Sequence, residues 1–415
     1  MVYRISSTTA NDNLTYYLKQ RQHEMDKVNH QINTGKKVRI PREDPVAAAH
    51  GMTHNTKISM IKQFARNIES AEGELGIIES RFNSTIEIMQ RVRELTVQGA
   101  NGTYSAQDRK YIAVEIDQLL NETISIANSQ YKGNFLFSGF QLDTKPFQAI
   151  TGIQREAGEE LVKEVLYFGD GGFHQREIDT DEYLAVNLPG NFSYWAEPFR
   201  IHSRVSTADF RLVNDQTIRI DNEVIRFQAG DNIYNIIEKI NLSNASVNAS
   251  LDPTSGALVF VTTRPHQPII EDIEGGNLMQ RLGILETNSP SGPNNFSKDA
   301  IIFGGSVFDV LINIRDAMFN NNADEIGSKS LASIDAAIEN ITYQLAELGS
   351  KSNRLKVASN RILQEKVFTM DILSKTEGVD LADAITELKK FEYAHKASLG
   401  TSARIMQPTL LDYLR

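Results

Sequence analysis

The distribution of proline is the feature that most constrains what this 415-residue chain can fold into. No proline occurs between Pro45 and Pro146, and none occurs between Pro293 and Pro408. Proline inside a helix costs about 3 kcal/mol, because it lacks the backbone donor and clashes with the preceding turn. The sequence therefore predicts two helical arms that flank a middle region, residues 140–300, which is not helical.

Apolar residues in the first arm recur at alternating spacings of four and three, the pattern of a helix packed along a seam. Asn101-Gly102 is expected to end this helix, and Ser105 with Asp108 resembles the N-terminal cap of a second helix. The seam of the first helix comprises Phe64, Ile68, Ala71, Leu75, Ile78, Phe82, Thr85, Met89, Val92 and Thr96. The second helix is expected to bury Ile112, Ile116, Leu119, Thr123 and Ile126.

The second arm repeats this pattern. A short helix is expected to bury Val307, Val310, Ile314 and Met318. The long helix after it has a seam of Leu331, Ile334, Ile338, Ile341, Leu345, Leu348, Leu355 and Ile362. Four such helices can close a common core, so the arms predict an elongated helical bundle built from both ends of the chain.

A further apolar stripe lies at each extreme end. Neither stripe can bury its apolar face alone, and isolated helices are marginally stable in water. Two interpretations stay open: the two ends pair within one monomer, or they are assembly segments that order against neighbouring subunits. The candidate interface residues are Leu14, Leu18, Met25, Val28 and Ile32 at the front, and Leu381, Ile385, Leu388, Leu399, Met406, Leu410, Leu411 and Leu414 at the back.

The middle region is acidic and has strand patterns. Residues 140–300 carry 13 Lys and Arg against 23 Asp and Glu, so they account for the whole net charge of −10. We expect a small β-domain at 140–205, with strands near 161–168 and 183–188. A ββαββ module should follow at 206–288, and a linker at 289–300. In the module, Asp221-Asn222 should turn a hairpin and Asp231 should cap a short helix. The predicted fold is thus α+β and multidomain, a helical bundle with a β-rich insert.

Composition excludes several classes of function. The chain has no cysteine, which excludes disulfides, thiolate catalysis and cysteine-ligated metals. The pI near 5.4 argues against nucleic-acid binding. No stretch reaches the ~20 apolar residues of a membrane span, and the first residues lack the apolar core of a secretory signal. We therefore expect no membrane insertion and no cleaved signal.

Motifs for catalysis or metal binding are weak. His50 and His54 have metal-ligand spacing on a helix, but the glutamate of a zinc-protease motif is missing between them. The run 169–172 is glycine-rich but lacks the Lys-Ser/Thr of a phosphate loop. We expect no enzyme activity and no cofactor. A sugar-binding surface protein remains an alternative, with Tyr183, Tyr194 and Trp195 as the aromatic cluster that it would need.

Short motifs near both ends are the most specific signals. They are Asn33–Val38, Pro41 with Asp44–Ala48, Gly133–Gly139, Asp380–Ile385 and Gln407–Leu414. These motifs resemble those of the bacterial flagellin family, and the last is similar to the ending of its hook-associated protein 3 members. Ile240-Asn241 resembles the Ile-Asn of a repeat known in that family. Arg42-Glu43-Asp44 departs from the family's usual Asp pair.

The resemblance implies a structural protein of the bacterial flagellum that forms the junction ring between hook and filament. Residues 1–42 with 374–415 would be the inner assembly segments, and residues 43–139 with 301–373 the bundle. The implied partners are copies of this chain, the other hook–filament junction protein, filament flagellin and a flagellar export chaperone. The protein would be secreted by type III export to a flagellum that is external or periplasmic. Filament flagellin itself is the alternative within the family.

Overall fold

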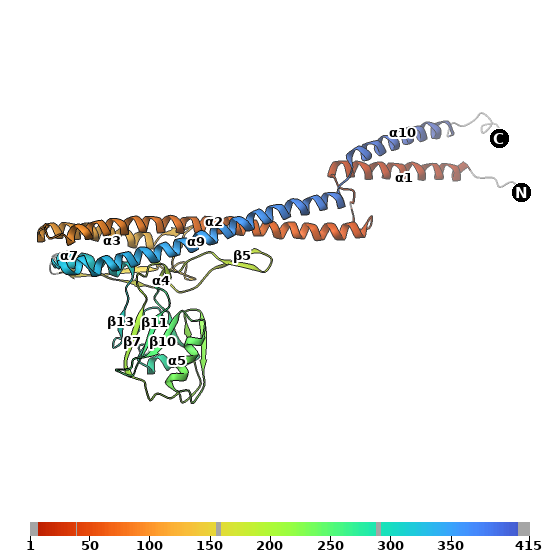
Figure 1. The fold of residues 1–415 in the computed structure, drawn as a ribbon. Coiled ribbons are helices and arrows are strands. Elements are labelled where there is room, and N and C mark those ends of the chain that lie inside the picture. Colours follow the sequence, from red (N-terminus) through yellow and green to blue (C-terminus); the bar gives the residue numbers. More distant parts are fainter. Residues whose placement is uncertain (1–6, 39, 155–158, 288–291, 406–415) are drawn as a thin grey trace, which may run out of the picture. The chain divides into compact units, whose positions relative to one another are not determined.

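The computed structural model describes residues 7–38, 40–154, 159–287 and 292–405 (Figure 1). The chain forms two compact units, one from residues 1–66 and 359–415 and the other from residues 67–358. The helices are α1 Ser7–Thr34, α2 Pro45–Ala100, α3 Ala106–Ala127, α4 Gly190–Ser193, α5 Ile233–Leu242, α6 Leu278–Arg281, α7 Val307–Phe319, α8 Ala323–Gly327, α9 Lys329–Glu377 and α10 Leu381–Ile405.

The strands all lie between residues 130 and 303 of the described chain. They are β1 Gln130–Tyr131, β2 Asn134–Phe135, β3 Phe147–Gln154, β4 Glu159–Tyr167, β5 Gln175–Asp179, β6 Glu182–Ala185, β7 Arg200–Ser206, β8 Gln216–Ile220, β9 Glu223–Phe227, β10 Val247–Leu251, β11 Ala257–Thr262, β12 Ile270–Ile273 and β13 Ile301–Phe303. The predicted α+β class, with helices from both ends and a β-rich insert, is confirmed.

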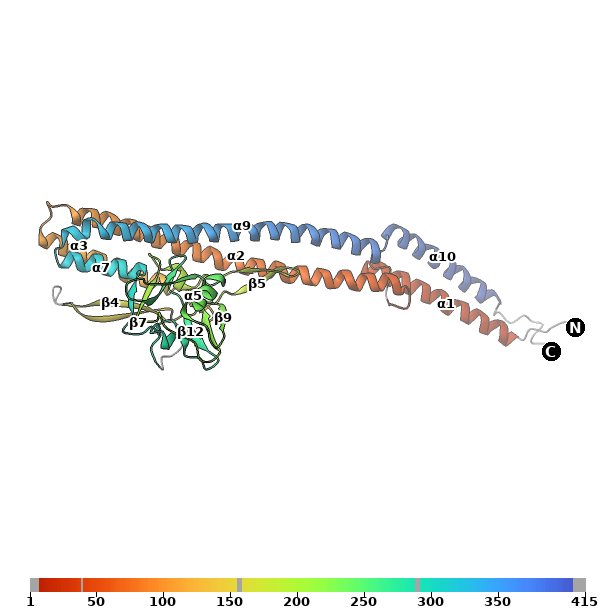
Figure 2. The same ribbon diagram turned by 60° about the horizontal axis from the view of Figure 1, so that its bottom comes forward.

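The first unit joins both ends of the chain. Helices α1 and α10 lie side by side in both views (Figures 1 and 2), and the start of α2 and the end of α9 complete the unit. Two backbone hydrogen bonds join the segment that follows α1 to the end of α9 and the segment that follows it. The Lys37 amide donates to the Glu377 carbonyl at 2.6 Å, and the Val379 amide donates to the Gly35 carbonyl at 3.0 Å. Gly35 has φ +69°, a left-handed conformation that favours glycine where α1 ends.

In the second unit, α2 buries its whole predicted seam. All of the seam residues from Ile68 to Thr96 are buried there. The two polar members are satisfied locally, because Thr85 donates to the Arg81 carbonyl at 2.9 Å and Thr96 donates to the Val92 carbonyl at 2.7 Å. A threonine can therefore replace an apolar residue in this seam without leaving an unpaired hydroxyl.

Helix α3 starts where the sequence predicts but buries a slightly different face. Ser105 and Asp108 form a capping box. The predicted Leu119 and Ile126 are only half-buried, whereas Leu120 and Ala127, each one position farther along, are buried, so this part of the prediction was wrong by one position. The buried face is set by helix α7, which packs on α3, rather than by a uniform heptad count.

Helix α7 confirms the prediction, with Val307, Val310, Ile314 and Met318 buried. A second capping box, formed by Ser306 and Asp309, begins this helix. Arg315 on α7 is fully buried, and its Nη1 bonds the Asp117 carboxylate of α3 at 2.8 Å while Nη2 bonds the Val162 carbonyl of β4 at 2.7 Å. This ion pair joins two helices and a strand.

Helix α9 was predicted correctly at every second seam position. Residues Ile334, Ile341, Leu348, Leu355 and Ile362 are buried, but the intervening Leu331, Ile338 and Leu345 are only half-buried. Asn340 and Gln344 are buried instead, because their amides donate to the Trp195 carbonyl at 2.6 Å and to the Phe192 carbonyl at 3.2 Å. The seam shifts toward the insert, whose backbone offers hydrogen-bond acceptors.

The insert contains two antiparallel sheets of three or more strands in the described residues. One has the order β10-β11-β7-β13 and the other β12-β8-β9. Strand β7 crosses the expected boundary between residues 205 and 206 and pairs with β11 of the module. Two-stranded pairs β3–β4 and β5–β6 precede the module. Trp195 is buried, as expected for a core residue.

The module confirms the predicted ββαββ order, β8-β9-α5-β10-β11. Asp221 in the hairpin turn has φ +52°, which such tight turns require. The predicted cap was wrong by one residue: Asn232, not Asp231, accepts the Asn235 amide at 2.9 Å, and Asp231 pairs with Lys239 instead. Ile233, Ile236 and Ile240 of α5 pack on the sheets to form the module's core.

Candidate assembly surfaces

The α1–α10 pair gives the geometry of the terminal stripes. On α1, Val28 is buried and Leu14, Leu18, Met25 and Ile32 are half-buried. Arg21, which interrupts this stripe, reaches across: its Nη1 donates to the Ala394 carbonyl of α10 at 2.6 Å and also bonds the Ser398 hydroxyl. The predicted stripe of α1 is therefore the side that packs against α10.

Helix α10 presents a different side to α1 from the one that the sequence suggested. Its buried and half-buried positions at spacings of four and three are Ala384, Leu388, Phe391, His395, Ser398 and Ser402. Small or polar residues make up four of these six positions, so hydrophobicity alone could not find this side. The signal that could have found it is the spacing itself, which continues through alanine and serine.

The apolar side of α10 that the sequence singled out remains exposed. Leu381 is 51% exposed, Ile385 49% and Leu399 48%, while Leu388 is half-buried at the border of the two sides. Helix α10 thus carries two stripes, one covered by α1 and one uncovered. The remaining candidates, Met406, Leu410, Leu411 and Leu414, lie outside the described residues.

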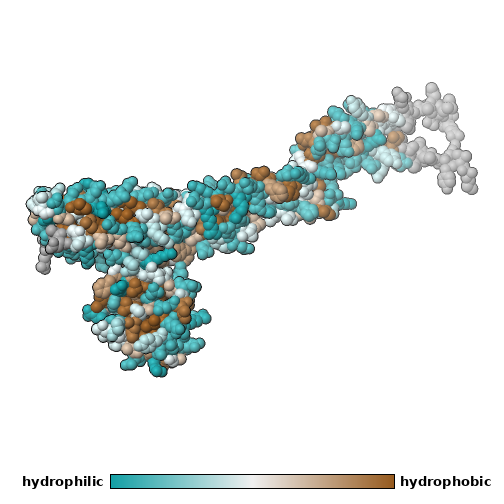
Figure 3. All heavy atoms as spheres, viewed as in Figure 1, coloured by the Kyte–Doolittle hydropathy of each residue, from teal (hydrophilic) through white to brown (hydrophobic). Residues whose placement is uncertain are grey.

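More apolar side chains are exposed elsewhere in the same unit, and Figure 3 shows hydrophobic residues on its visible face over α9 and α10. They belong to α1, to the start of α2 and to the end of α9: Tyr16, Tyr17, Val46, Met52, Met60, Leu363, Val367, Phe368 and Met370. Contiguous apolar surface of this kind marks an interaction site in a folded protein. The unit offers far more apolar surface than its own few helices cover.

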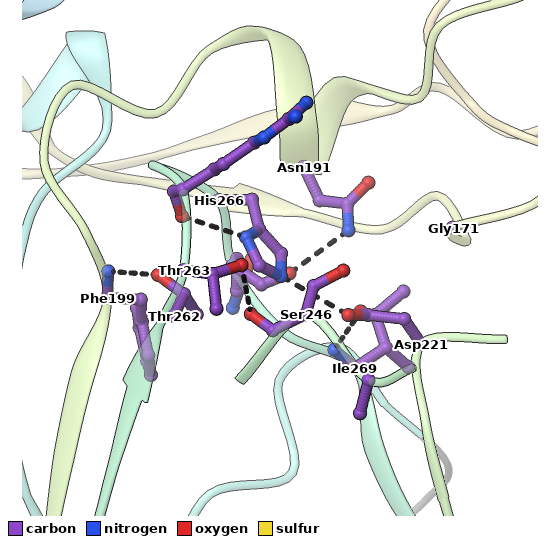
Figure 4. A network of polar contacts seen from close by, with 12 residues as sticks. Gly171, Asn191, Phe199, Asp221, Ser246, Thr262, Thr263, His266 and Ile269 are labelled. Atoms are coloured by element: carbon purple, nitrogen blue, oxygen red, sulfur yellow. Dashed lines mark hydrogen bonds and ion pairs between the residues drawn. The ribbon is translucent and has the colours of Figure 1, made fainter. Parts of the chain in front are cut away.

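A polar network fixes the module within the second unit (Figure 4). His266 is fully buried, stacks on Phe192 with ring centroids 4.6 Å apart, and contacts the Asp221 carboxylate at 3.2 Å. The Asn191 amide donates to the Gln267 carbonyl at 3.0 Å, and the Ile269 amide donates to the other Asp221 oxygen at 3.0 Å. Sequence reasoning missed this network, since its members are far apart in the chain.

The candidate metal ligands of the sequence do not come together in the described residues. His50 is exposed and His54 half-buried, and no group of three or more potential ligands could hold a metal ion in that part of the chain. Burial raises the pKa of Tyr167, whose hydroxyl donates to the backbone carbonyls of Phe137 and Asp170 and thus has a packing role.

A search of the described helices for membrane spans finds none with the length and apolar character to cross a bilayer.

Comparison with known protein families gives three matches along the chain. Residues 5–141 match the bacterial flagellin N-terminal helical region, and residues 331–414 match the bacterial flagellin C-terminal helical region. Residues 214–264 match the flagellin hook IN motif. The first two matches lie on the helical arms, and the third lies on the ββαββ module.

Individual proteins show the same similarity. Flagellin B of Vibrio anguillarum is 23% identical over 412 residues, which is 98% of this chain and 97% of the relative. Flagellar hook-associated protein 3 of Salmonella typhimurium is 29% identical over 132 residues, 32% of this chain and 42% of the relative. A crystal structure of flagellar hook-associated protein-3 from Legionella pneumophila is 18% identical, with a TM-score of 0.45, and covers 78% of this chain and 98% of that one.

Proposed function

Because this chain belongs to the bacterial flagellin family, we propose that it is a structural protein of the flagellum that forms the junction between hook and filament. It acts by assembling with copies of itself, with the other hook–filament junction protein on the hook side and with flagellin on the filament side. The protein reaches this place by type III export with the help of a flagellar chaperone, and it ends outside the cell or in the periplasm.

The observation that carries the assembly role is the uncovered stripe of α10. Leu381, Ile385 and Leu399 are about half exposed after α1 has packed on α10. Fully burying one leucine or isoleucine contributes roughly 1.5–3 kcal/mol, so covering the exposed half of these three side chains would supply roughly 2–5 of the ~8 kcal/mol of a micromolar contact. Both readings of the terminal stripes then apply: one stripe pairs within the monomer and the other is left for a neighbour.

The choice of the junction over the filament has separate support. The ending Asp412-Tyr413-Leu414 and the Thr34-Gly35-Lys36 form resemble hook-associated members more than filament flagellin. Flagellins match along the full length at low identity, so filament flagellin is the alternative that an experiment must separate.

Deletion of the gene tests the proposal. Electron microscopy should show hooks without filaments, with unassembled flagellin in the medium. Normal filaments on the deletion strain would contradict a junction role. Filaments that are lost together with all secreted flagellin would indicate that this chain is the filament subunit.

Complementation tests the stripe itself. A chain with Leu381→Asp and Ile385→Asp should be secreted but fail to restore filaments, because two carboxylates cannot be buried without partners. Ala382→Asp with Thr386→Asp is the matched control: it adds the same two charges, each one residue farther along and about 100° around the helix, at exposed positions. Restoration by both variants would show that the stripe is not a contact.

A further inference from the structure

The four-stranded sheet β10-β11-β7-β13 has one face against the module's core, and its opposite face is exposed on the β13 side, whereas Val259 of β11 on that face is buried. Ile201, Ala249 and Phe260 point into the core with α5. Residues paired across antiparallel strands share a face, so the register places Arg200 with Val261 and Phe303, and His202 with Val259 and Ile301, on the opposite side. We refer to this side of the sheet as the outer face.

The outer face has the wrong character for a surface that meets only water. An antiparallel sheet with a solvated side normally alternates apolar-in with polar-out residues. Here, Ile301 is 41% exposed and Phe303 54% exposed, and Val261 is half-buried. The apolar residues lie on β11 and β13, the two neighbours of β7, and the Arg200 and His202 side chains of β7 lie between them.

Strand β13 is also an open edge. It pairs with β7 on one side only, and all three of its residues, Ile301, Ile302 and Phe303, are exposed apolar side chains. Proteins usually protect such edges with charges, proline or a covering segment. An unprotected apolar edge next to an apolar face is a template for a partner.

The charges on the outer face are positive and free. Arg200 and Arg204 of β7 are exposed, and neither side chain has an ion-pair partner in the described residues. The Nε2 atom of His202 is buried without a hydrogen-bond partner among those residues, beside the Phe303 ring at 5.6 Å. This basic cluster sits on an insert that otherwise has an excess of ten acidic residues, 23 against 13.

We propose that the outer face of this sheet is a docking surface for the acidic insert of a neighbouring copy of this chain. The inference rests on the proposed function, since assembly supplies the neighbour. The charges decide the occupant: a basic patch is complementary to the insert of the next subunit, which has 23 Asp and Glu against 13 Lys and Arg. Because the patch and its complement are different surfaces, the contact is head-to-tail and can continue around a ring.

Cysteine labelling tests the contact directly, because the natural chain has no cysteine of its own. Ile301→Cys reports on the outer face, and Tyr234→Cys is the control, an exposed residue on α5 on the other side of the core. In isolated flagella that contain the full-length variants, maleimide should label the residue at position 301 about tenfold or more slowly than in the free protein, while the control keeps its rate.

Charge reversal tests the electrostatic part. Arg200→Glu with Arg204→Glu should return the labelling rate at position 301 in flagella to that of the free protein, without a change in melting temperature. Arg226→Glu, an exposed arginine on β9, is the matched control and should have no effect. High salt should act in the same direction as the double reversal, since it screens charges at the surface.

The outcomes separate the two proposals. If immunolabelling finds no protein in flagella, the proposed function fails. If the protein is present and position 301 is labelled as fast as in the free protein, the docking surface is wrong and the proposed function stands. Protection that the double reversal leaves unchanged would also overturn the inference, because some partner other than an acidic insert would then cover the face.

Discussion

Helices α2 and α9 run through both units of the protein, and they behave differently in each. Between residues 67 and 358 they bury Leu75, Phe82 and Ile341 beneath other helices and the insert. In the unit of residues 1–66 and 359–415, the same helices expose Met52, Met60 and Val367. The chemistry of the sequence changes little along these helices, but the number of packing neighbours does.

This difference in burial indicates what each unit is suited to do. In the unit of residues 67–358 the seam of α2 is covered, and polar residues fix the internal geometry, as Arg315 and Asn340 do. A unit that leaves apolar residues uncovered is stabilised further by anything that covers them. The first kind suits a body that is exposed in a flagellum, and the second suits a segment completed by neighbours.

The largest effect is expected for a charge in the covered seam. Leu75→Asp should lower the free energy of unfolding by about 5 kcal/mol, close to the entire stability of a typical domain, because an unpaired carboxylate would be buried. Circular dichroism melts measure it. Leu381→Asp is the matched change in the open unit and should leave the melting temperature within a few degrees, because Leu381 is exposed. Equal losses of melting temperature in both variants would show that the two units do not differ in how they bury these positions.

The buried ion pair should be the next most sensitive feature. Asp117→Ala should cost about 2–3 kcal/mol, because the fully buried Arg315 would lose its charged hydrogen bond to α3 while it keeps its ion pair with Asp316. Asp335→Ala removes the partner of Arg93 in an exposed pair and should cost less than ~1 kcal/mol. Chemical denaturation of both variants measures the difference, and similar midpoints would show that the Arg315 site admits water.

A smaller effect on stability is expected for Asn241, whose side chain forms the pair of hydrogen bonds that a neighbouring strand would form. Asn241 at the end of α5 donates to the Ala249 carbonyl at 2.9 Å and accepts the Ala249 amide at 2.7 Å, which ties the helix to β10. Asn241→Ala should cost about 1–3 kcal/mol by removing both bonds. Asn248→Ala on β10, an exposed asparagine, is the control. If both variants have the same melting temperature, the two hydrogen bonds of Asn241 do not contribute to the stability of this unit.

The smallest effect concerns pH. The pKa of the Glu74 carboxyl is raised, chiefly by burial and despite the attraction of Arg176. The folded protein therefore holds the proton more tightly than the unfolded chain, so the stabilising contribution is present below the unfolded value of 4.5 and is lost as the pH rises through the raised pKa. The difference in melting temperature between Glu74→Gln and the natural chain should therefore be more favourable to the variant at pH 7 than at pH 4. A constant offset at both values would contradict the burial of this carboxylate.

Prediction from sequence succeeded where apolar residues alone determine burial. The α2 seam was found in full, since each member from Ile68 to Val92 is apolar or a threonine that bonds its own helix. It failed where a partner determines burial. Asn340 is buried because the Trp195 carbonyl lies beside it, and nothing near residue 340 in the sequence indicates that.

The terminal helices show the same limit in another form. The sequence singled out the most apolar side of α10, with Leu381 and Ile385, as a candidate interface and left its partner open, whereas α1 covers the side with Ala384 and Ser402. Hydrophobic patterns show which surfaces gain from burial, but not which partner covers them. In a chain that assembles, those are separate questions, and only the second distinguishes contacts within the chain from contacts between chains.

The pairing of α3 with α7 also determines an order of events in folding. Residues 128–306 separate the two helices, and closing a flexible loop of that length costs about 4–5 kcal/mol of chain entropy. Capping boxes let each helix begin from local signals, at Ser105 and at Ser306, but they do not bring the helices together. The insert does so once it is folded, because Trp195 then bridges to Ser306 and β13 lies against β7. We therefore expect the β-rich middle of the chain to become structured before α3 and α7 close around Arg315.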